Sequence, residues 1–205
     1  PEGIWSKCPE CDSPHYSKAL KDNLNVCPKC DYHFSLTAPE RVGITVDEGS
    51  FEEWDAEMLS ADPLEFKGPK TYQEKLESDK KNTGLRDAVL TGCGKINGQT
   101  ISLAVTDSRF IMGSMGSVVG EKITRAIERA TEQKLPVAII SGSGGGARMY
   151  EGLFSLMQMA KTCAALARHN QAGLLYISVL TNPTMAGVMA SFAGIGDVII
   201  AEPRA

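Results

Sequence analysis

The sequence lacks long hydrophobic runs and has little histidine and little net charge. No apolar stretch approaches the roughly 20 residues that a membrane-spanning helix requires. With 3 histidines and a formal net charge of −4, the chain has no overall electrostatic attraction for nucleic acid. No charged-then-apolar leader begins the sequence, so we expect a reducing compartment. Hydrophobic residues still form 42% of the 205 residues, which indicates a globular protein with one sizeable core.

Four of the six cysteines form two Cys-x-x-Cys pairs, Cys8 with Cys11 and Cys27 with Cys30. In a reducing compartment such pairs favour a metal site over disulfides. Two knuckles at this spacing can deliver four thiolates tetrahedrally to one Zn²⁺. Since protein fills all four positions, no position remains for water or substrate. The sequence therefore predicts one structural zinc ion in a ribbon over residues 1–35.

Zinc ribbons often bind nucleic acid, and the local charge bears on that alternative. Residues 1–35 contain four lysines and five acidic residues, whereas phosphate contact needs a basic surplus. The charge therefore disfavours a nucleic-acid-binding ribbon, and salt-dependent binding to DNA or RNA would discriminate it. We expect His15 and His33 to lie beside the cysteines rather than to replace them as ligands.

Two further zones follow the ribbon. Residues 36–84 predict a charged, helical connecting arm, with a capping box that begins at Thr37. The stretch from Asp47 to Asp62 carries seven acidic residues and no basic one, so we expect it to be solvated. Residues 85–205 are richer in apolar residues and predict the core.

The core zone alternates strand and helix patterns, which predicts an α/β layered fold. Asn97-Gly98 indicates a two-residue hairpin between two strands. The expected elements are the strands 88–95, 99–106, 137–140, 174–180 and 198–201, and the helices 117–134, 151–169 and 188–192.

A glycine-rich loop, Ser141 to Met149, runs from a predicted strand into a helix. Glycine permits close approach of the backbone to a ligand, and unpaired N–H groups at a helix start favour negative charge. The spacing of Gly142, Gly144 and Ala147 also fits a dinucleotide-binding loop. That interpretation requires an acidic residue about 20 positions later, and the chain has none between positions 151 and 197.

Three interpretations of the loop remain. Ser143 as a hydrolase nucleophile is disfavoured, because His169 precedes the only later acids and the elbow motif is broken. The second is an oxyanion hole of backbone N–H groups, which needs no nucleophilic side chain and suits an enolate formed from a thioester. The third, a crotonase-type hydrolase or isomerase of acyl-CoA, would need a nearby carboxylate, for which Glu151 is the local candidate.

Together, four ordered motifs resemble the β subunit of the carboxyltransferase component of bacterial and plastid acetyl-CoA carboxylase. The similarity covers nearly the whole chain. The motifs are the zinc knuckles, Gly113 to Glu121, Gly145 to Met149, and Ser155 to Lys161.

The resemblance implies a crotonase-like ββα spiral, incomplete at the C-terminal side of this chain, behind the zinc ribbon. It implies transfer of a carboxyl group from carboxybiotin to acetyl-CoA, giving malonyl-CoA for fatty acid synthesis. Biotin would arrive on a separate biotin carboxyl carrier protein, loaded by biotin carboxylase. The partner would be an α subunit, in an α2β2 heterotetramer in the bacterial cytoplasm or, alternatively, the plastid stroma.

The resemblance also implies the site residues. Amides of the Gly144–Ala147 loop, at Gly145 and Gly146, would stabilise the enolate, while Ala147, Arg148 and Gly187 would contact substrate. For Arg148 a structural ion pair at the loop is the favoured interpretation, and a turn is the alternative for Gly187. The cluster Lys122, Arg125 and Arg129 could meet the CoA phosphates, although a solvated helix face is the favoured interpretation.

This chain departs from the family pattern at several positions. It has one additional glycine in the loop and Tyr150 in place of glutamine, which leaves open which amide faces the oxyanion. Asn182 replaces an aspartate and Ala186 replaces a glycine. Transfer to another acyl-CoA, such as propionyl-CoA, is an alternative that the sequence leaves open.

Overall fold

The computed structural model describes residues 4–205, together with all side chains in this range except that of Ala186. Residues 1–3 of the predicted ribbon and the side chain of Ala186 therefore lie outside the described part. The strands are β1 (Trp5–Lys7), β2 (Pro14–Tyr16), β3 (Glu52–Glu53), β4 (Val89–Ile96), β5 (Gln99–Thr106), β6 (Val137–Ser143), β7 (Tyr176–Thr184) and β8 (Val198–Ala201). The helices are α1 (Ser17–Asp22), α2 (Ala38–Thr45), α3 (Tyr72–Thr83), α4 (Ser117–Gln133), α5 (Leu153–Gln171) and α6 (Ala186–Met189), with 3₁₀ turns η1 (Ile111–Gly113), η2 (Met149–Glu151) and η3 (Phe192–Gly194).

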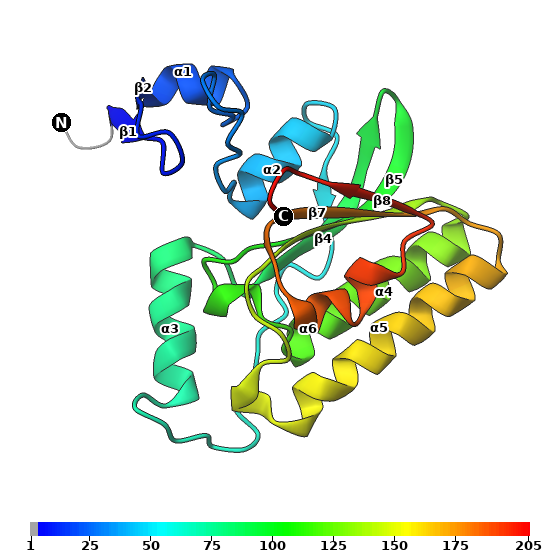
Figure 1. Cartoon of the computed structure of the whole chain (residues 1–205). Helices are drawn as coiled ribbons and strands as arrows, with labels where there is room; N and C mark the ends of the chain where they lie inside the picture. The colour runs from blue at the N-terminus through cyan, green and yellow to red at the C-terminus, as the bar shows by residue number, and fades with distance from the viewer. Residues whose placement is uncertain (1–3) are drawn as a thin grey trace.

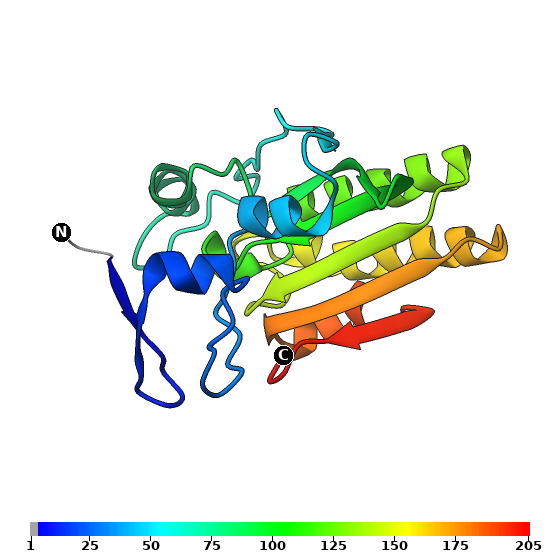
Figure 2. The same ribbon diagram turned by 90° about the horizontal axis from the view of Figure 1, so that it is seen from above.

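A six-stranded sheet in the order β3-β4-β5-β6-β7-β8 forms the centre of the molecule. The first three strands are antiparallel, and β5 to β8 run parallel. The long helices α4 and α5 lie side by side on one face of the sheet, and α2 lies on the other (Figures 1 and 2). This arrangement confirms the α/β fold predicted from the sequence.

Side chains that alternate along β5 and β6 build a separate core on each face of the sheet. Val137 and Ile139 point to the α4 and α5 side, where they join the larger cluster with Ile123 and Ile127. Ala138 and Ile140 point to the other side, where Ala38 and Val42 of α2 cover them. The two-residue period of a strand thus explains why this sheet is hydrophobic on both faces.

Local signals in the sequence set several of these elements. Asn97 and Gly98 have φ of 51° and 78°, as a type I′ hairpin turn requires, and they join β4 to β5 in register. The capping box at Thr37 forms as predicted, and Thr71 caps α3 in the same way. Gly84 then ends α3 in the left-handed conformation.

The acidic stretch of residues 47–62 is solvated only in part. Its four glutamates are exposed, as expected, whereas its three aspartates are half-buried. Glu53 lies in β3, and its carboxylate is 3.3 Å from Nζ of Lys122. Asp55 accepts from the guanidinium groups of Arg125 (3.1 Å) and Arg129 (2.6 Å), which project from α4. Lys122, Arg125 and Arg129, the cations considered above for the CoA phosphates, are therefore paired with acidic residues of the arm. These ion pairs hold the arm against α4.

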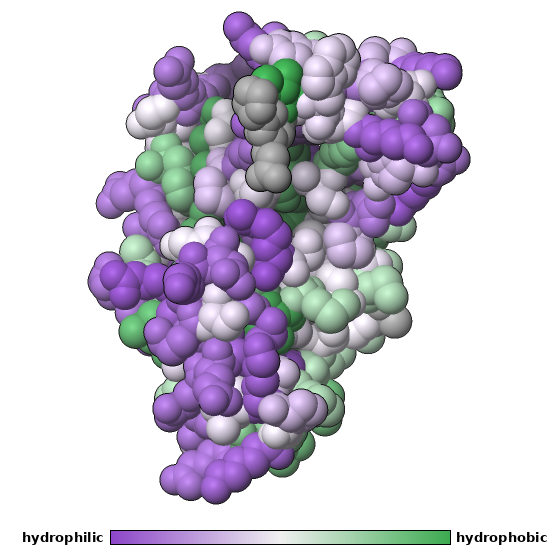
Figure 3. Space-filling view, turned by 90° about the vertical axis from the view of Figure 1, so that its left-hand side faces the viewer, coloured by the Kyte–Doolittle hydropathy of each residue, from purple (hydrophilic) through white to green (hydrophobic). Residues whose placement is uncertain are grey.

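The ribbon stands at one end of the molecule, beyond α2 (Figure 1). Ser35 Oγ donates to the carbonyl of Asn182 (3.1 Å), and Arg204 pairs with Glu10, so the ribbon contacts the C-terminal segments. The face that carries α3 is largely hydrophilic (Figure 3), as the composition of that helix predicts. Among residues 4–205, the helices include none with the length and hydrophobicity needed to cross a bilayer.

Candidate functional site

The four cysteines of the two knuckles come together at the tip of the ribbon. Their Sγ atoms all lie within 4.8 Å of one another, with Cys8 3.6 Å from Cys30 and Cys11 3.7 Å from Cys27. Four sulfurs at Zn–S distances of about 2.3 Å are separated by about 3.8 Å in a tetrahedron. A disulfide needs about 2.05 Å, so the thiols are unbridged and their spacing fits a zinc ion.

The two knuckles have the same backbone geometry. The N–H of Asp12 donates to the carbonyl of Cys8, and that of Asp31 donates to the carbonyl of Cys27, both at 3.0 Å. Both aspartates have left-handed φ values of 58° and 57°. The signal is visible in the sequence as a repeated Cys-Pro-x-Cys-Asp, because aspartate tolerates this conformation better than most residues. His15 supports the site, with Nε2 3.2 Å from Sγ of Cys27.

The glycine loop leaves the end of β6 and is paired with the segment that follows β5. The N–H of Gly145 donates to the carbonyl of Met112, the N–H of Met115 donates to the carbonyl of Gly146, and the N–H of Arg148 donates to the carbonyl of Met115, all at 2.8 Å. The amide of Gly145 is therefore engaged within the protein. This corrects the expectation that Gly145 is one of the two oxyanion donors.

With Gly145 engaged, the amides of Gly146 and Ala147 are candidate donors, among the loop amides without an acceptor in the described residues, which also include those of Gly144 and Met149. Among the backbone hydrogen bonds of residues 4–205, the N–H of neither Gly146 nor Ala147 has an acceptor. Both residues line a cavity of about 390 Å³, whose wall also includes Met112, Lys75 and Arg109. Cavities of this size accept small-molecule ligands. The arrangement thus places two adjacent unpaired amides at a hollow in the surface.

Gly187 lies against the glycine loop rather than in a free turn. A Cβ atom on Gly187 would lie 2.4 Å from Cα of Gly146, closer than real contacts allow. A Cβ atom on Gly146 would in turn lie 3.3 Å from Cα of Gly187. Two backbones can approach this closely only without side chains. Gly187 therefore sets the position of Gly146.

Arg148 belongs to the wall of the cavity, but its side chain is completely enclosed. Its Nη2 atom is 2.6 Å from Oδ1 of Asp87, and its Nη1 atom is 2.9 Å from Oη of Tyr72. Burial alone would raise the pKa of Asp87, but the adjacent guanidinium and the hydrogen bonds it donates hold that pKa below its usual value. The guanidinium is thus engaged in a buried ion pair, as its structural role would require, and has no exposed surface to offer a substrate. Sequence reasoning missed Asp87 and Tyr72, since nothing in their local pattern points to a partner more than 60 residues away.

The structure removes the hydrolase interpretations. The Ser143 hydroxyl is 1% exposed and donates to the carbonyl of Gly113. His169 is fully buried, with Nδ1 2.8 Å from Oγ1 of Thr131, so it serves no nucleophile. Glu151 is 1% exposed and accepts from Tyr72 Oη and from the N–H of Ser117, which keeps its carboxylate away from the cavity.

The fold and the loop define a carboxyl transferase domain behind a zinc ribbon. The family model "Carboxyl transferase domain" matches residues 34–203, and the model "Acetyl-CoA carboxylase zinc finger domain" matches residues 5–30. The chain belongs to the family of acetyl-CoA carboxylase carboxyl transferase β subunits.

Curated relatives carry this family name in bacteria and in a chloroplast. A Rhodopirellula baltica protein is 58% identical over the whole chain, which spans 66% of that protein. A Desulforamulus reducens protein is 59% identical, with 70% of it covered, and a chloroplastic Pyropia yezoensis protein is 54% identical, with 71% covered. All three are named as the β subunit of the acetyl-coenzyme A carboxylase carboxyl transferase. The chain thus spans about two thirds of the length of these relatives.

Solved structures support the same fold. The transcarboxylase 12S core with bound methylmalonyl-coenzyme A has a TM-score of 0.67 and 26% identity, over 82% of this chain and 30% of that chain. A Pseudomonas malonate decarboxylase heterodimer has a TM-score of 0.60 at 24% identity, over 81% of this chain and 61% of that chain, and shows likeness of fold alone.

Proposed function

We propose that the protein transfers a carboxyl group from carboxybiotin to acetyl-CoA, which yields malonyl-CoA for fatty acid synthesis. The observation that carries this proposal is the pair of unpaired amides, Gly146 and Ala147, at the wall of the 390 Å³ cavity. Together they can stabilise the negative oxygen of a thioester enolate, for which each donor contributes roughly 2.7–4 kcal/mol. The names of the curated relatives support the same reaction.

The reaction balances without a side-chain base. Carboxybiotin, when bound, would supply carbon dioxide by loss of its N-carboxyl group, and its urea nitrogen would then be able to take a proton from the methyl group of acetyl-CoA. The enolate carbon then attacks carbon dioxide. The chain's own residues bind the thioester, orient it and hold its oxygen at the two amides, consistent with the absence of a free carboxylate or histidine among the described residues beside them.

The four knuckle cysteines, in this proposal, hold one structural Zn²⁺. Their sulfur spacing fits the ion, and a fourth protein ligand leaves no position for a reacting water. The residues 1–35, 36–84 and 85–205 then act as ribbon, connecting arm and transferase core. The arm is fastened to the core by Asp55 and β3, so we expect it to move with the core.

The proposed assembly follows the family. An α subunit would complete the site in an α2β2 heterotetramer, and a biotin carboxyl carrier protein, loaded by biotin carboxylase, would deliver the carboxyl group. Bacterial cytoplasm is the proposed location, with the plastid stroma as the alternative that the chloroplastic relative supports.

The test is carboxyl transfer in reverse, from malonyl-CoA to biocytin, by the full-length protein assembled with its α subunit. Release of acetyl-CoA that needs both proteins and biocytin is the expected result. Parallel assays with methylmalonyl-CoA measure the preference for acetyl over propionyl groups. A zinc-loaded, correctly assembled complex that releases no acetyl-CoA would overturn the proposal.

A further inference from the structure

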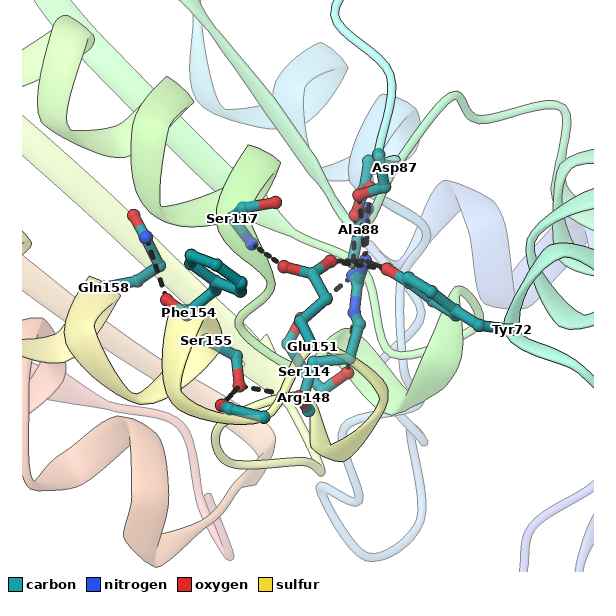
Figure 4. Close-up of polar contacts among 12 residues, drawn as sticks. Tyr72, Asp87, Ala88, Ser114, Ser117, Arg148, Glu151, Phe154, Ser155 and Gln158 are labelled. Carbon is teal, nitrogen blue, oxygen red and sulfur yellow. Dashed lines mark hydrogen bonds and ion pairs between the residues drawn. The ribbon is translucent and has the colours of Figure 1, made fainter. Parts of the chain in front are cut away.

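A closed group of buried polar side chains lies directly behind the glycine loop (Figure 4). Arg148 is at its centre, with its guanidinium bound by Asp87, by Tyr72 Oη and, at 3.1 Å, by the carbonyl of Ser114. Tyr72 belongs to α3 and Asp87 precedes β4, so the connecting arm and the first long strand both reach this point. Each of the three side chains is at most 2% exposed.

Glu151 extends this group to helix α4. Its Oε1 atom accepts from Tyr72 Oη at 2.5 Å, and its Oε2 atom accepts from the N–H of Ser117 at 2.6 Å. Ser117 is the first residue of α4, where unpaired N–H groups and the helix dipole favour a carboxylate. A Cβ atom on Gly116 would lie 2.7 Å from Glu151 Oε1 and 2.8 Å from Arg148 Nη1, so glycine is required there for the two side chains to meet.

The backbone of Arg148 is fixed as firmly as its side chain. Its N–H donates to the carbonyl of Met115 at 2.8 Å, and its carbonyl accepts from Ser155 Oγ at 2.6 Å. Arg148 directly follows Ala147 in the chain. The orientation of the two free amides is therefore set, one residue away, by contacts to three separate segments.

Aromatic packing strengthens this group. The ring of Tyr150 stacks on Tyr72 with centroids 5.0 Å apart and planes 9° apart. The ring of Phe66 packs edge-on against the ring of Tyr150, with their centroids 5.1 Å apart. Tyr150 thus holds Tyr72 of the arm in place through aromatic packing, in addition to the hydrogen bonds that Tyr72 makes.

We propose that Tyr72, Asp87 and Glu151 are positioning residues, which act through Arg148 to aim the amides of Gly146 and Ala147 at the thioester oxygen. None of them reaches the substrate cavity, so they contribute by geometry alone. The inference rests on the proposed function for its kinetic consequence, whereas its structural consequence is measurable without any reaction. Misplacement of an aligned group lowers the rate of the chemical step more than it weakens binding.

The experiment compares Tyr72→Phe with Tyr176→Phe in the full-length protein assembled with its α subunit. Each change removes one buried tyrosine hydroxyl and retains the ring. Tyr176 Oη donates to the carbonyl of Phe192 at 2.7 Å, away from the glycine loop, so it is a matched control for lost stability. The two measurements are amide hydrogen exchange of the peptide over residues 144–148, and kcat and KM for malonyl-CoA in the biocytin assay.

Tyr72→Phe is expected to speed exchange in the loop peptide and to lower kcat by about tenfold, with KM changed less than twofold. Glu151→Gln leaves one acceptor oxygen for two donors, Tyr72 Oη and the N–H of Ser117, and is expected to act similarly. The double variant is expected to lose less than the product of the two effects, since both changes weaken the same Tyr72–Glu151 contact. Tyr176→Phe should leave the loop exchange and kcat unchanged.

The outcomes separate the two proposals. If Tyr72→Phe speeds exchange in the loop peptide while the wild-type complex transfers no carboxyl group, the positioning role is supported and the proposed function is overturned. An active wild type in which Tyr72→Phe matches Tyr176→Phe in exchange and in kcat overturns the positioning role and leaves the proposed function standing.

Discussion

The zinc ribbon and the transferase core are ordered by different forces. Between residues 4 and 35 the buried hydrophobic residues are Cys8, Leu20 and Cys27, of which two are predicted metal ligands. The larger core cluster, in contrast, contains more than twenty buried residues from the sheet and its helices. A ribbon with so little apolar burial cannot offset the entropy of folding by packing alone. The comparison predicts that the ribbon depends on metal and the core on packing, so that each is expected to fail under different conditions.

The largest expected effect comes from removal of the metal. Chelation of the metal, or Cys27→Ser, is expected to unfold the ribbon, since zinc binding contributes roughly 10–16 kcal/mol to the folding free energy of zinc-finger peptides. Hydrogen exchange over residues 4–35 should rise to that of an unfolded chain, while protection in β5 and β6 persists. Cys163→Ser is the control, because Cys163 lies on α5 outside the cluster. A chelated protein with a still protected ribbon would show that packing, and not metal, orders it.

The next largest effect concerns the charge buried in the core. Asp87→Ala leaves the fully enclosed Arg148 guanidinium without its main partner, and such a change is expected to lower the free energy of unfolding by about 3–5 kcal/mol. Denaturant titration of the core measures it. Glu128→Ala is the matched control, because its pair with Arg168 is exposed and contributes only about 0–1 kcal/mol. Equal losses in the two variants would contradict the view that the core depends on its internal ion pair.

A smaller effect on stability, but a marked one on activity, is expected from Gly187→Ala. The added Cβ meets the backbone of Gly146 and must displace it, at a cost of about 1–3 kcal/mol. A shift of the loop by an ångström lowers the rate by roughly 100-fold. Gly43→Ala in α2 is the control, because a Cβ there has no neighbour within 4 Å and alanine favours a helix by about 1 kcal/mol. Initial rates and melting temperatures of both variants measure these effects. Equal rates in the two variants would contradict a role of Gly187 in placing the loop.

The smallest effect separates the two regions by their response to acid. Burial alone would raise the pKa of Asp107, but the hydrogen bonds from Arg109 and from the N–H of Ala38 hold that pKa below its usual value. This carboxylate therefore stabilises the core above the unfolded pKa of about 3.9, and the contribution is lost as pH falls through the lower pKa of the folded state.

Asp107→Asn should accordingly make the free energy of unfolding of the core less steep in pH below about 4. Glu132→Gln, at an exposed position, is the control. The ribbon is expected to respond at higher pH, because protons compete with zinc for thiolates. Simultaneous loss of ribbon and core on acidification would contradict two independently ordered regions.

Short-range patterns made much of the fold predictable. The Asn97-Gly98 turn, the Thr37 capping box, the two cysteine knuckles and the strand at Val198–Ala201 each depend on neighbours in the sequence, and the structure contains them all. The alternation of strands and helices was enough to predict an α/β fold. Each of these features is encoded by residues that lie close together in the sequence, so it can be recognised without knowledge of the fold.

The parts that could not be predicted depend on distant partners. Asp55 was expected in solvent because its neighbours are acidic, yet its partners Arg125 and Arg129 lie some 70 residues later. The N–H of Gly145 was expected to be free, but it donates to the carbonyl of Met112, which lies in another segment. Likewise the enclosure of Arg148 follows from Asp87 and Tyr72, which no local motif connects to the glycine loop. Charge composition alone does not distinguish a solvated residue from one whose partner lies elsewhere in the fold.

The contact between Gly146 and Gly187 constrains which substitutions this protein can accept during evolution. The backbone of Gly146 excludes a side chain at Gly187, and a side chain at Gly146 would have to shift Gly187 by a few tenths of an ångström. Substitutions in the two loops are therefore coupled, although the loops lie 41 positions apart. A lineage that acquires a side chain at either position is expected to recover only by changes that move whole segments apart, for example near Pro183 or Met112, which flank the neighbouring Gly144. Selection for suppressors of Gly187→Ala would therefore map, by genetics alone, the segments that hold the two loops together.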